Sequence, residues 1–167
     1  MIIDVFLMSA PGWLIEHAPA LLVVVPLLLA PLCAIIPNGR VAWLLSVIGS
    51  FCALICAIIM TAQVRRLTAI PDADNFISYA MGGWQPPLGI EFRIDALNAL
   101  VLLIVSGIGA LASIFSWPSV QAEVRKEKHA MFYSAYLICF TGLLGVAATG
   151  DAFNLFVFLE ILSLIHI

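Results

Sequence analysis

Charged residues are scarce in this sequence: they make up 10% of its 167 residues, whereas 63% are hydrophobic. A soluble domain carries about 25% charged residues, because its surface must be hydrated. The mean hydropathy of the chain is +1.14. This scarcity of charge excludes a water-soluble globule and predicts an integral membrane protein.

Basic charge is also scarce, since 7 Lys and Arg residues face 10 Asp and Glu residues, for a net charge of −3. A chain without a basic patch is not expected to bind nucleic acid. The N-terminus lacks the Lys- and Arg-rich start of a secretory signal peptide. The first long apolar run is therefore predicted to stay in the protein as a membrane helix.

Motifs of soluble enzymes and metal sites are missing as well. The four cysteines lie inside apolar runs, without a CxxC pair or the Cys/His spacing of a zinc site. Cys52 and Cys56 are four residues apart and share a helix face, so they are either a metal pair or small packing residues. The sequence has no nucleotide-binding loop, haem motif or nucleophile elbow. We therefore predict no soluble catalytic site, no cofactor and no metal.

Long apolar runs dominate what is present. A membrane helix needs about 20 apolar residues to cross a hydrocarbon core of about 30 Å. The charge-free runs of that length are Ala18–Pro37, Val41–Val64, Ala96–Ala122 and Ala130–Gly150. A further apolar run begins near Ala152. At the other end of the chain, Pro19 suits the start of the first helix. Because backbone groups in lipid must pair internally, the predicted fold is an all-α integral membrane protein with four complete transmembrane helices and the start of a fifth.

The polar segments between these runs predict the connections and the orientation. Apolar and polar residues alternate from Leu88 to Ile94, which permits a short strand or hairpin. Asp95 precedes an apolar run and is predicted to be a helix N-cap. With the N-terminus outside, the inner loops hold Arg40, Arg125, Lys126 and Lys128, against Arg65, Arg66 and Arg93 in the outer loop. This balance favours an outside N-terminus under the positive-inside rule.

Glu160 is the most informative residue, because it is a carboxylate inside an apolar run. A helix that begins near Asp151 places it about 13 Å along, at 1.5 Å per residue, close to the middle of the hydrocarbon core. An intramembrane acid is costly unless it is paired, protonated or hydrated, and such residues mark ion and proton paths. Glu160 is thus the candidate for ion or proton translocation. The alternatives are a hydrogen-bonding residue of structural importance only, or a residue at the end of a differently placed helix.

Two further residues have weaker functional interpretations. Asp151 follows Gly150 at a predicted turn, where it is either a helix N-cap or a surface residue that guides cations. His129 lies at the inner start of the fourth helix, where it is either the entry to a proton relay or an interfacial histidine.

Three stretches together resemble a known family. They are TGDAFNLFVFLE (149–160), YAMGGWQPPLGIEFRIDALNALVLL (79–103) and KHAMFYSAYLICFTGLLG (128–145). The first is similar to the signature of antiporter-like membrane subunits, which include the proton-pumping subunits of respiratory complex I. The other two are most similar to the D-type subunit of Mrp-type multisubunit sodium/proton antiporters.

The resemblance implies that this chain is the N-terminal part of a fourteen-helix subunit with its N-terminus outside. It also implies that Glu160 matches the family's buried glutamate, which is essential to ion translocation and pairs with a lysine on the seventh helix. The domain 1–161 would then be the first five helices, the last one incomplete. Residues 162–167, LSLIHI, are also what CTG TCT CTT ATA CAC ATC encodes, a string that resembles a transposon end used in sequencing libraries. We therefore expect 162–167 to be adaptor read-through.

The predicted function is that of a subunit in a monovalent cation (sodium)/proton antiporter complex, in other words a secondary transporter and not an enzyme. The alternative is a proton-translocating membrane subunit of NADH-quinone oxidoreductase or of a related membrane hydrogenase, and a third is an inactive membrane scaffold. The expected partners are other membrane subunits, protons, monovalent cations and the lipid bilayer. The expected location is a bacterial inner (plasma) membrane.

Overall fold

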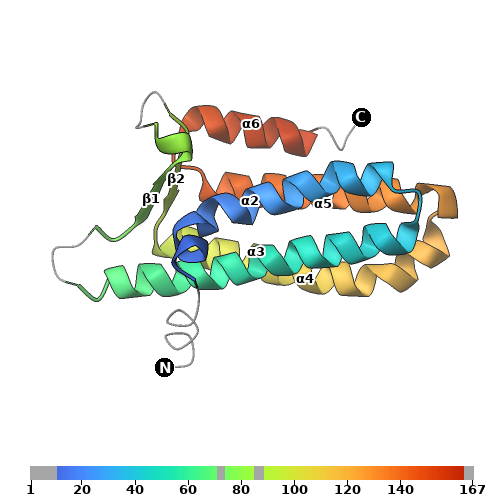
Figure 1. Cartoon of the computed structure of the whole chain (residues 1–167), viewed down its shortest axis with the longest axis horizontal. Coiled ribbons are helices and arrows are strands. Elements are labelled where there is room, and N and C mark those ends of the chain that lie inside the picture. The colour runs from blue at the N-terminus through green and yellow to red at the C-terminus, as the bar shows by residue number, and fades with distance from the viewer. Residues whose placement is uncertain (1–10, 71–73, 85–88, 164–167) are drawn as a thin grey trace.

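In the computed structural model, the described residues form five α-helices and one short β-hairpin (Figure 1). The structure describes residues 11–70, 74–84 and 89–163. The helices are α2 (Gly12–Ile35), α3 (Gly39–Leu67), α4 (Ala96–Glu123), α5 (His129–Ala148) and α6 (Ala152–Ser163). The strands are β1 (Ile77–Ala80) and β2 (Glu91–Ile94), and two 3-10 turns cover Met81–Gly83 and Lys126–Lys128.

Successive helices run in opposite directions, so the chain crosses the bundle at each helix (Figure 1). Helix α2 packs against α3 and α5, and α4 also packs against both α3 and α5. Helix α6 packs against α5 at the edge of this four-helix bundle. One end of the bundle therefore carries the hairpin and the start of α6, and we call it the hairpin end. The other carries the α2–α3 and α4–α5 connections, and we call it the loop end.

Small residues form much of the buried side of α3. Ala42, Ser46, Gly49, Ala53 and Ala57 recur every three or four residues on that side and are buried. The exposed large hydrophobic residues of α3 are Val41, Leu44, Ile48, Phe51 and Ile55. Helices in lipid approach one another through small residues, because lipid tails are as apolar as leucine. Small buried residues and large exposed hydrophobic residues are the distribution expected of a helix in a bilayer.

The hairpin closes one end of the bundle. Strands β1 and β2 are antiparallel, with Ile77 opposite Ile94 and Ala80 opposite Glu91. Phe92 and Ile94 are buried in the core, which explains why the predicted alternation of apolar and polar residues ends in a strand. In addition to its pairing within the hairpin, Phe92 forms an isolated antiparallel bridge with Thr149 at the end of α5.

The predicted helices are confirmed, with one boundary wrong. Four helices are long and apolar enough to cross a membrane among the residues that the structure describes. The chain is thus an integral membrane protein of the predicted all-α class. Helix α2 nevertheless begins at Gly12, and Pro19 lies inside it. The charge-free run begins only at Ala18, after Glu16 and His17. Both of these residues are exposed at the hairpin end, where a membrane helix can extend into water.

Only the first two residues of the segment predicted to be adaptor read-through, 162–167, are among the described residues. Leu162 and Ser163 continue α6, and residues 164–167 lie outside the described residues.

Candidate ion-translocation site

Helix α6 has two different faces, and Glu160 lies on the outer one. Asn154 and Phe158 are buried against the bundle. Phe153, Phe156 and Glu160 are exposed on α6. Among the described residues, no Lys or Arg forms an ion pair with Glu160, and its hydrogen-bond donor is Ser163, with Oγ 3.4 Å from Oε2. The described residues therefore do not bury Glu160, and its burial stays a prediction.

Packing against α5 fixes the orientation of this face. The ring of Phe158 lies directly over Gly145, so close that a Cβ at that position would overlap it. The same ring stacks on Phe92 of the hairpin, with 6.3 Å between the ring centroids. Because residues 158 and 160 are separated by about 200° around an α-helix, burying Phe158 turns Glu160 away from α5.

Asp151 starts α6 and also ties it to the hairpin. Its Oδ1 accepts a hydrogen bond from the backbone N–H of Asn154 at 2.7 Å, which is an N-cap interaction. Its Oδ2 accepts a longer bond, 3.4 Å, from the N–H of Glu91. The N–H of Gly150 in turn donates to the carbonyl of Glu91 at 2.9 Å. The N-cap interpretation of Asp151 is thus confirmed, and the cation-guiding role stays a prediction.

Asn154 is a polar residue whose burial was not predicted from the sequence. It is 4% exposed, and its Nδ2 has no hydrogen-bond partner in the described part of the chain. Leaving a buried donor unpaired costs about 1–3 kcal/mol. The signal was present, because Asn154 is the only amide side chain in the apolar run after Asp151. It faces inward on the same helix whose outer face carries Glu160.

His129 lies at the loop end, far from Glu160. It is buried, and its Nε2 is 2.8 Å from the carbonyl oxygen of Val124. Helix α5 spans about 30 Å at 1.5 Å per residue, and Glu160 is only about 12 Å from the hairpin end along α6. The structure therefore does not bring His129 and Glu160 together, so a relay through His129 stays a prediction that needs groups between them.

The described residues contain no cluster of three or more His, Cys, Asp and Glu side chains that could hold a metal ion. Cys52 and Cys56 are free thiols on the same helix. The geometry thus provides a carboxylate on an otherwise apolar outer face, held in place by packing and by a capped helix start.

Known proteins share this sequence and this arrangement of helices. The N-type subunit of NADH-quinone oxidoreductase from Desulforudis audaxviator is 34% identical over 148 residues, which cover 89% of this chain and 28% of the relative. The D-type subunit of the Na(+)/H(+) antiporter from Bacillus subtilis is 35% identical over 83 residues, or 50% of this chain and 16% of the relative. A solved structure of the Mrp complex from Dietzia sp. DQ12-45-1b matches 90% of this chain and 26% of its own chain, with a TM-score of 0.72 and 27% identity. No protein-family model matches.

The chain is therefore similar in sequence and in helix arrangement to subunits of membrane complexes. More particularly, the chain is a homologue of the antiporter-like subunits. The proteins similar to it include both Na(+)/H(+) antiporter and NADH-quinone oxidoreductase subunits. The chain spans about a quarter of the length of the relatives that it matches over most of its own length.

Proposed function

We propose that this chain is part of a monovalent cation/proton antiporter subunit and that Glu160 carries or couples the translocated charge. One observation carries the proposal: Glu160 is a carboxylate on the outer face of an apolar helix, in a chain homologous to antiporter subunits. The match to an Mrp complex structure over 90% of the chain supports an antiporter complex as its setting.

The chemistry follows from the cost of a charge in lipid. A carboxylate in a low-dielectric setting holds a proton more tightly, whereas a cation beside it favours the ionised form. Moving a cation toward and away from Glu160 would therefore make it release and take up a proton in turn. The described residues provide no such cation beside Glu160, so the partner comes from another part of the subunit or from a neighbouring subunit.

The orientation and setting belong to the same proposal. The loop end carries four Lys and Arg residues, Arg40, Arg125, Lys126 and Lys128. Under the positive-inside rule this end faces the cytoplasm, which leaves the hairpin end and the N-terminus outside. We propose the bacterial plasma membrane as the location and further membrane subunits, protons and sodium or a similar cation as the partners.

The decisive experiment replaces Glu160 in the complete protein and measures cation/proton exchange in membrane vesicles with a pH-sensitive dye. Glu160→Gln keeps the size of the side chain but removes its charge, and we expect exchange to fall at least about tenfold. Glu127→Gln is the matched control, because Glu127 is an exposed carboxylate in the α4–α5 connection. Unchanged exchange in Glu160→Gln at normal membrane abundance would favour an inactive scaffold.

The second candidate function is proton translocation within an NADH-quinone oxidoreductase or a related hydrogenase. The relative from NADH-quinone oxidoreductase favours it, because the 34% identity extends over 89% of this chain. Purifying the complex through a tag on this chain separates the two functions. Co-purified redox subunits and NADH-driven proton uptake would support the second, whereas small membrane subunits and exchange driven by an imposed cation gradient would support the first.

A further inference from the structure

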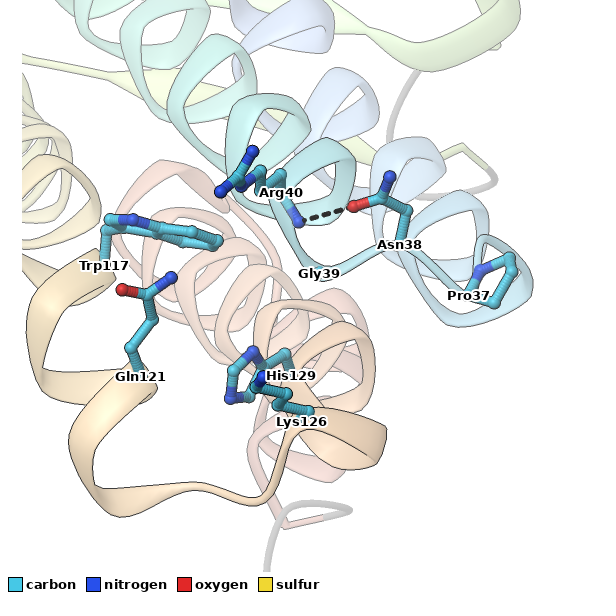
Figure 2. Close-up of a pocket in the computed structure, with 8 residues that line it drawn as sticks. All are labelled: Pro37, Asn38, Gly39, Arg40, Trp117, Gln121, Lys126 and His129. Carbon is cyan, nitrogen blue, oxygen red and sulfur yellow. Dashed lines mark hydrogen bonds between the residues drawn. The ribbon is translucent and has the colours of Figure 1, made fainter.

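The loop end contains a polar cavity of about 590 Å³ that the translocation mechanism does not use. It lies between the α2–α3 connection, the last turns of α4 and the first residues of α5 (Figure 2). Its side chains include Arg40, Trp117, Gln121, Lys126 and His129. Residues from three parts of the sequence therefore surround one space.

The cavity is positively charged, and its charges are unpaired. The side chains of Arg40 and Lys126 form no ion pair or hydrogen bond with any described residue, and no Asp or Glu lines the cavity. Among the described residues, the other charged side chains of this end are the exposed Glu123 and Glu127 and the exposed Arg125 and Lys128. Four cations against two carboxylates leave a net positive charge, which attracts an anion.

The shape of the cavity depends on specific packing. Gly39 lies against His129, where an added Cβ would be only 2.8 Å from the His129 Cβ. The Nε2 of His129 is engaged with the carbonyl of Val124, which holds the ring edge-on to Trp117 at 6.5 Å between ring centroids. The indole of Trp43 donates to the carbonyl of Ser113 at 2.9 Å and so fixes α3 to α4 beside the cavity. The space is thus held open by structure on three sides.

An apolar surface continues from the cavity toward the middle of the bundle. Leu44 and Ile48 follow Arg40 at intervals of four residues, so all three lie on one face of α3. Leu44 is 49% exposed and Ile48 is 53% exposed. The indoles of Trp43 and Trp117 are in contact at this depth, 5.3 Å between centroids, as expected for the aromatic residues of a membrane interface. A free phosphate ion makes no favourable contact with such an apolar surface, whereas the acyl chains of a lipid do.

We propose that this cavity binds the phosphate headgroup of an anionic phospholipid, such as phosphatidylglycerol. Arg40 and Lys126 contact the phosphate oxygens, Gln121 donates to the headgroup from α4, and the acyl chains follow the Arg40–Ile48 face of α3. Basic pockets between transmembrane helices on the cytoplasmic side are suited to such headgroups. The site is separate from Glu160 and does not depend on the proposed ion exchange.

Native mass spectrometry of the complete protein, delipidated in detergent and titrated with phosphatidylglycerol or phosphatidylcholine, tests this proposal. We expect the wild type to bind phosphatidylglycerol more tightly than phosphatidylcholine. The double variant Arg40→Gln/Lys126→Gln is expected to weaken phosphatidylglycerol binding about tenfold or more, because each cation near an anionic surface contributes substantially. Phosphatidylcholine binding is expected to stay unchanged.

The matched control is Arg125→Gln/Lys128→Gln, which removes the same charge from the same end of the bundle but from outside the cavity. An equal loss in this control would overturn the proposal in favour of a diffuse surface attraction. Displacement of the lipid by millimolar inorganic phosphate would overturn the lipid assignment in favour of a soluble anion. An intact multisubunit complex that binds no phosphatidylglycerol at this site would show that protein covers it, which also contradicts the proposal.

Discussion

The contacts between elements at the hairpin end and the cavity at the loop end use their polar side chains in opposite ways. At the hairpin end, Asp151 caps α6 and contacts β2, and Asn98 Nδ2 donates to the carbonyl of Ala147 at 2.8 Å, which ties α4 to α5. His17 Nδ1 lies 3.1 Å from the hydroxyl of Tyr79, between α2 and β1. At the loop end, Arg40 and Lys126 line a cavity (Figure 2), and their side chains form no hydrogen bond or ion pair with any described residue.

This difference indicates a division of work between the ends. Hydrogen bonds between elements stabilise the hairpin end, because a typical hydrogen bond contributes about 0.5–1.5 kcal/mol. Unpaired cations add nothing to the stability of the loop end, but they leave it free to bind an anion. We therefore expect substitutions of hydrogen-bonded polar residues to reduce stability, and substitutions of the two cavity cations to change binding instead.

The largest loss of stability is expected from a substitution that separates α6 from α5. Gly145→Leu adds a side chain where the ring of Phe158 already lies, and overpacking of this kind costs about 1–3 kcal/mol or more. Unfolding of the purified protein in mixed micelles, followed by circular dichroism, measures the loss. Gly107→Leu on α4 is the control, because no atom beyond its chain neighbours and the backbone of its own helix turns lies within 4 Å of the Cβ position there. Equal effects of the two substitutions would contradict the packing described for α6.

A smaller loss is expected from removing the cap that joins α6 to the hairpin. Asp151→Ala removes the acceptor for the N–H groups of Asn154 and Glu91, and loss of an N-cap costs about 0.5–2 kcal/mol. The same unfolding measurement applies. Asp151→Asn retains a capping oxygen and should restore most of the stability; a full loss in Asp151→Asn would show that the charge matters more than the cap.

A third loss, of about 1 kcal/mol, is expected at the loop end from Trp43→Phe. This change keeps an aromatic ring but removes the indole N–H that donates to Ser113, and a typical hydrogen bond contributes about 0.5–1.5 kcal/mol. Trp13→Phe is the control, because Trp13 is exposed at the start of α2. No difference between the two variants in unfolding would remove this bond from the support of the cavity.

The smallest effect on stability is expected from the two cations of the cavity. Arg40→Gln/Lys126→Gln should change the free energy of unfolding in lipid-free micelles by less than about 0.5 kcal/mol, as is usual for surface substitutions. Phosphatidylglycerol should stabilise the wild type but not this variant, since a ligand stabilises the state that binds it. A large loss without lipid would contradict the contrast between the two ends.

The positions of the helices could be predicted from the sequence more closely than their contacts. The run predicted at Ala96–Ala122 became α4 at Ala96–Glu123, and the predicted N-cap Asp95 accepts from the N–H groups of Leu97 and Asn98. Both depend on residues that are near in sequence. The start of α2 was missed, because a charge ends an apolar run but does not end a helix that reaches the membrane surface.

The candidate site divides in the same way. Glu160 was found from the sequence, since an acid in an apolar run is visible without a structure. Its outward orientation depends on Phe158 and Gly145, which are 13 residues apart and meet only when α6 packs on α5. The cavity at the loop end was not predicted, because Arg40 at the start of α3 and Lys126 in the α4–α5 connection line the same space only in the folded bundle.

The sequence by itself determined that the chain lies in a membrane, how many helices cross it and where a carboxylate interrupts them. These properties depend on the length and polarity of local runs, which the bilayer tests one segment at a time. Only the tertiary structure decided which face of α6 carries Glu160, how the hairpin holds the start of α6 and which side chains line the cavity at the loop end. Those features depend on contacts between residues far apart in the chain, and close packing through small residues selects one arrangement of the helices.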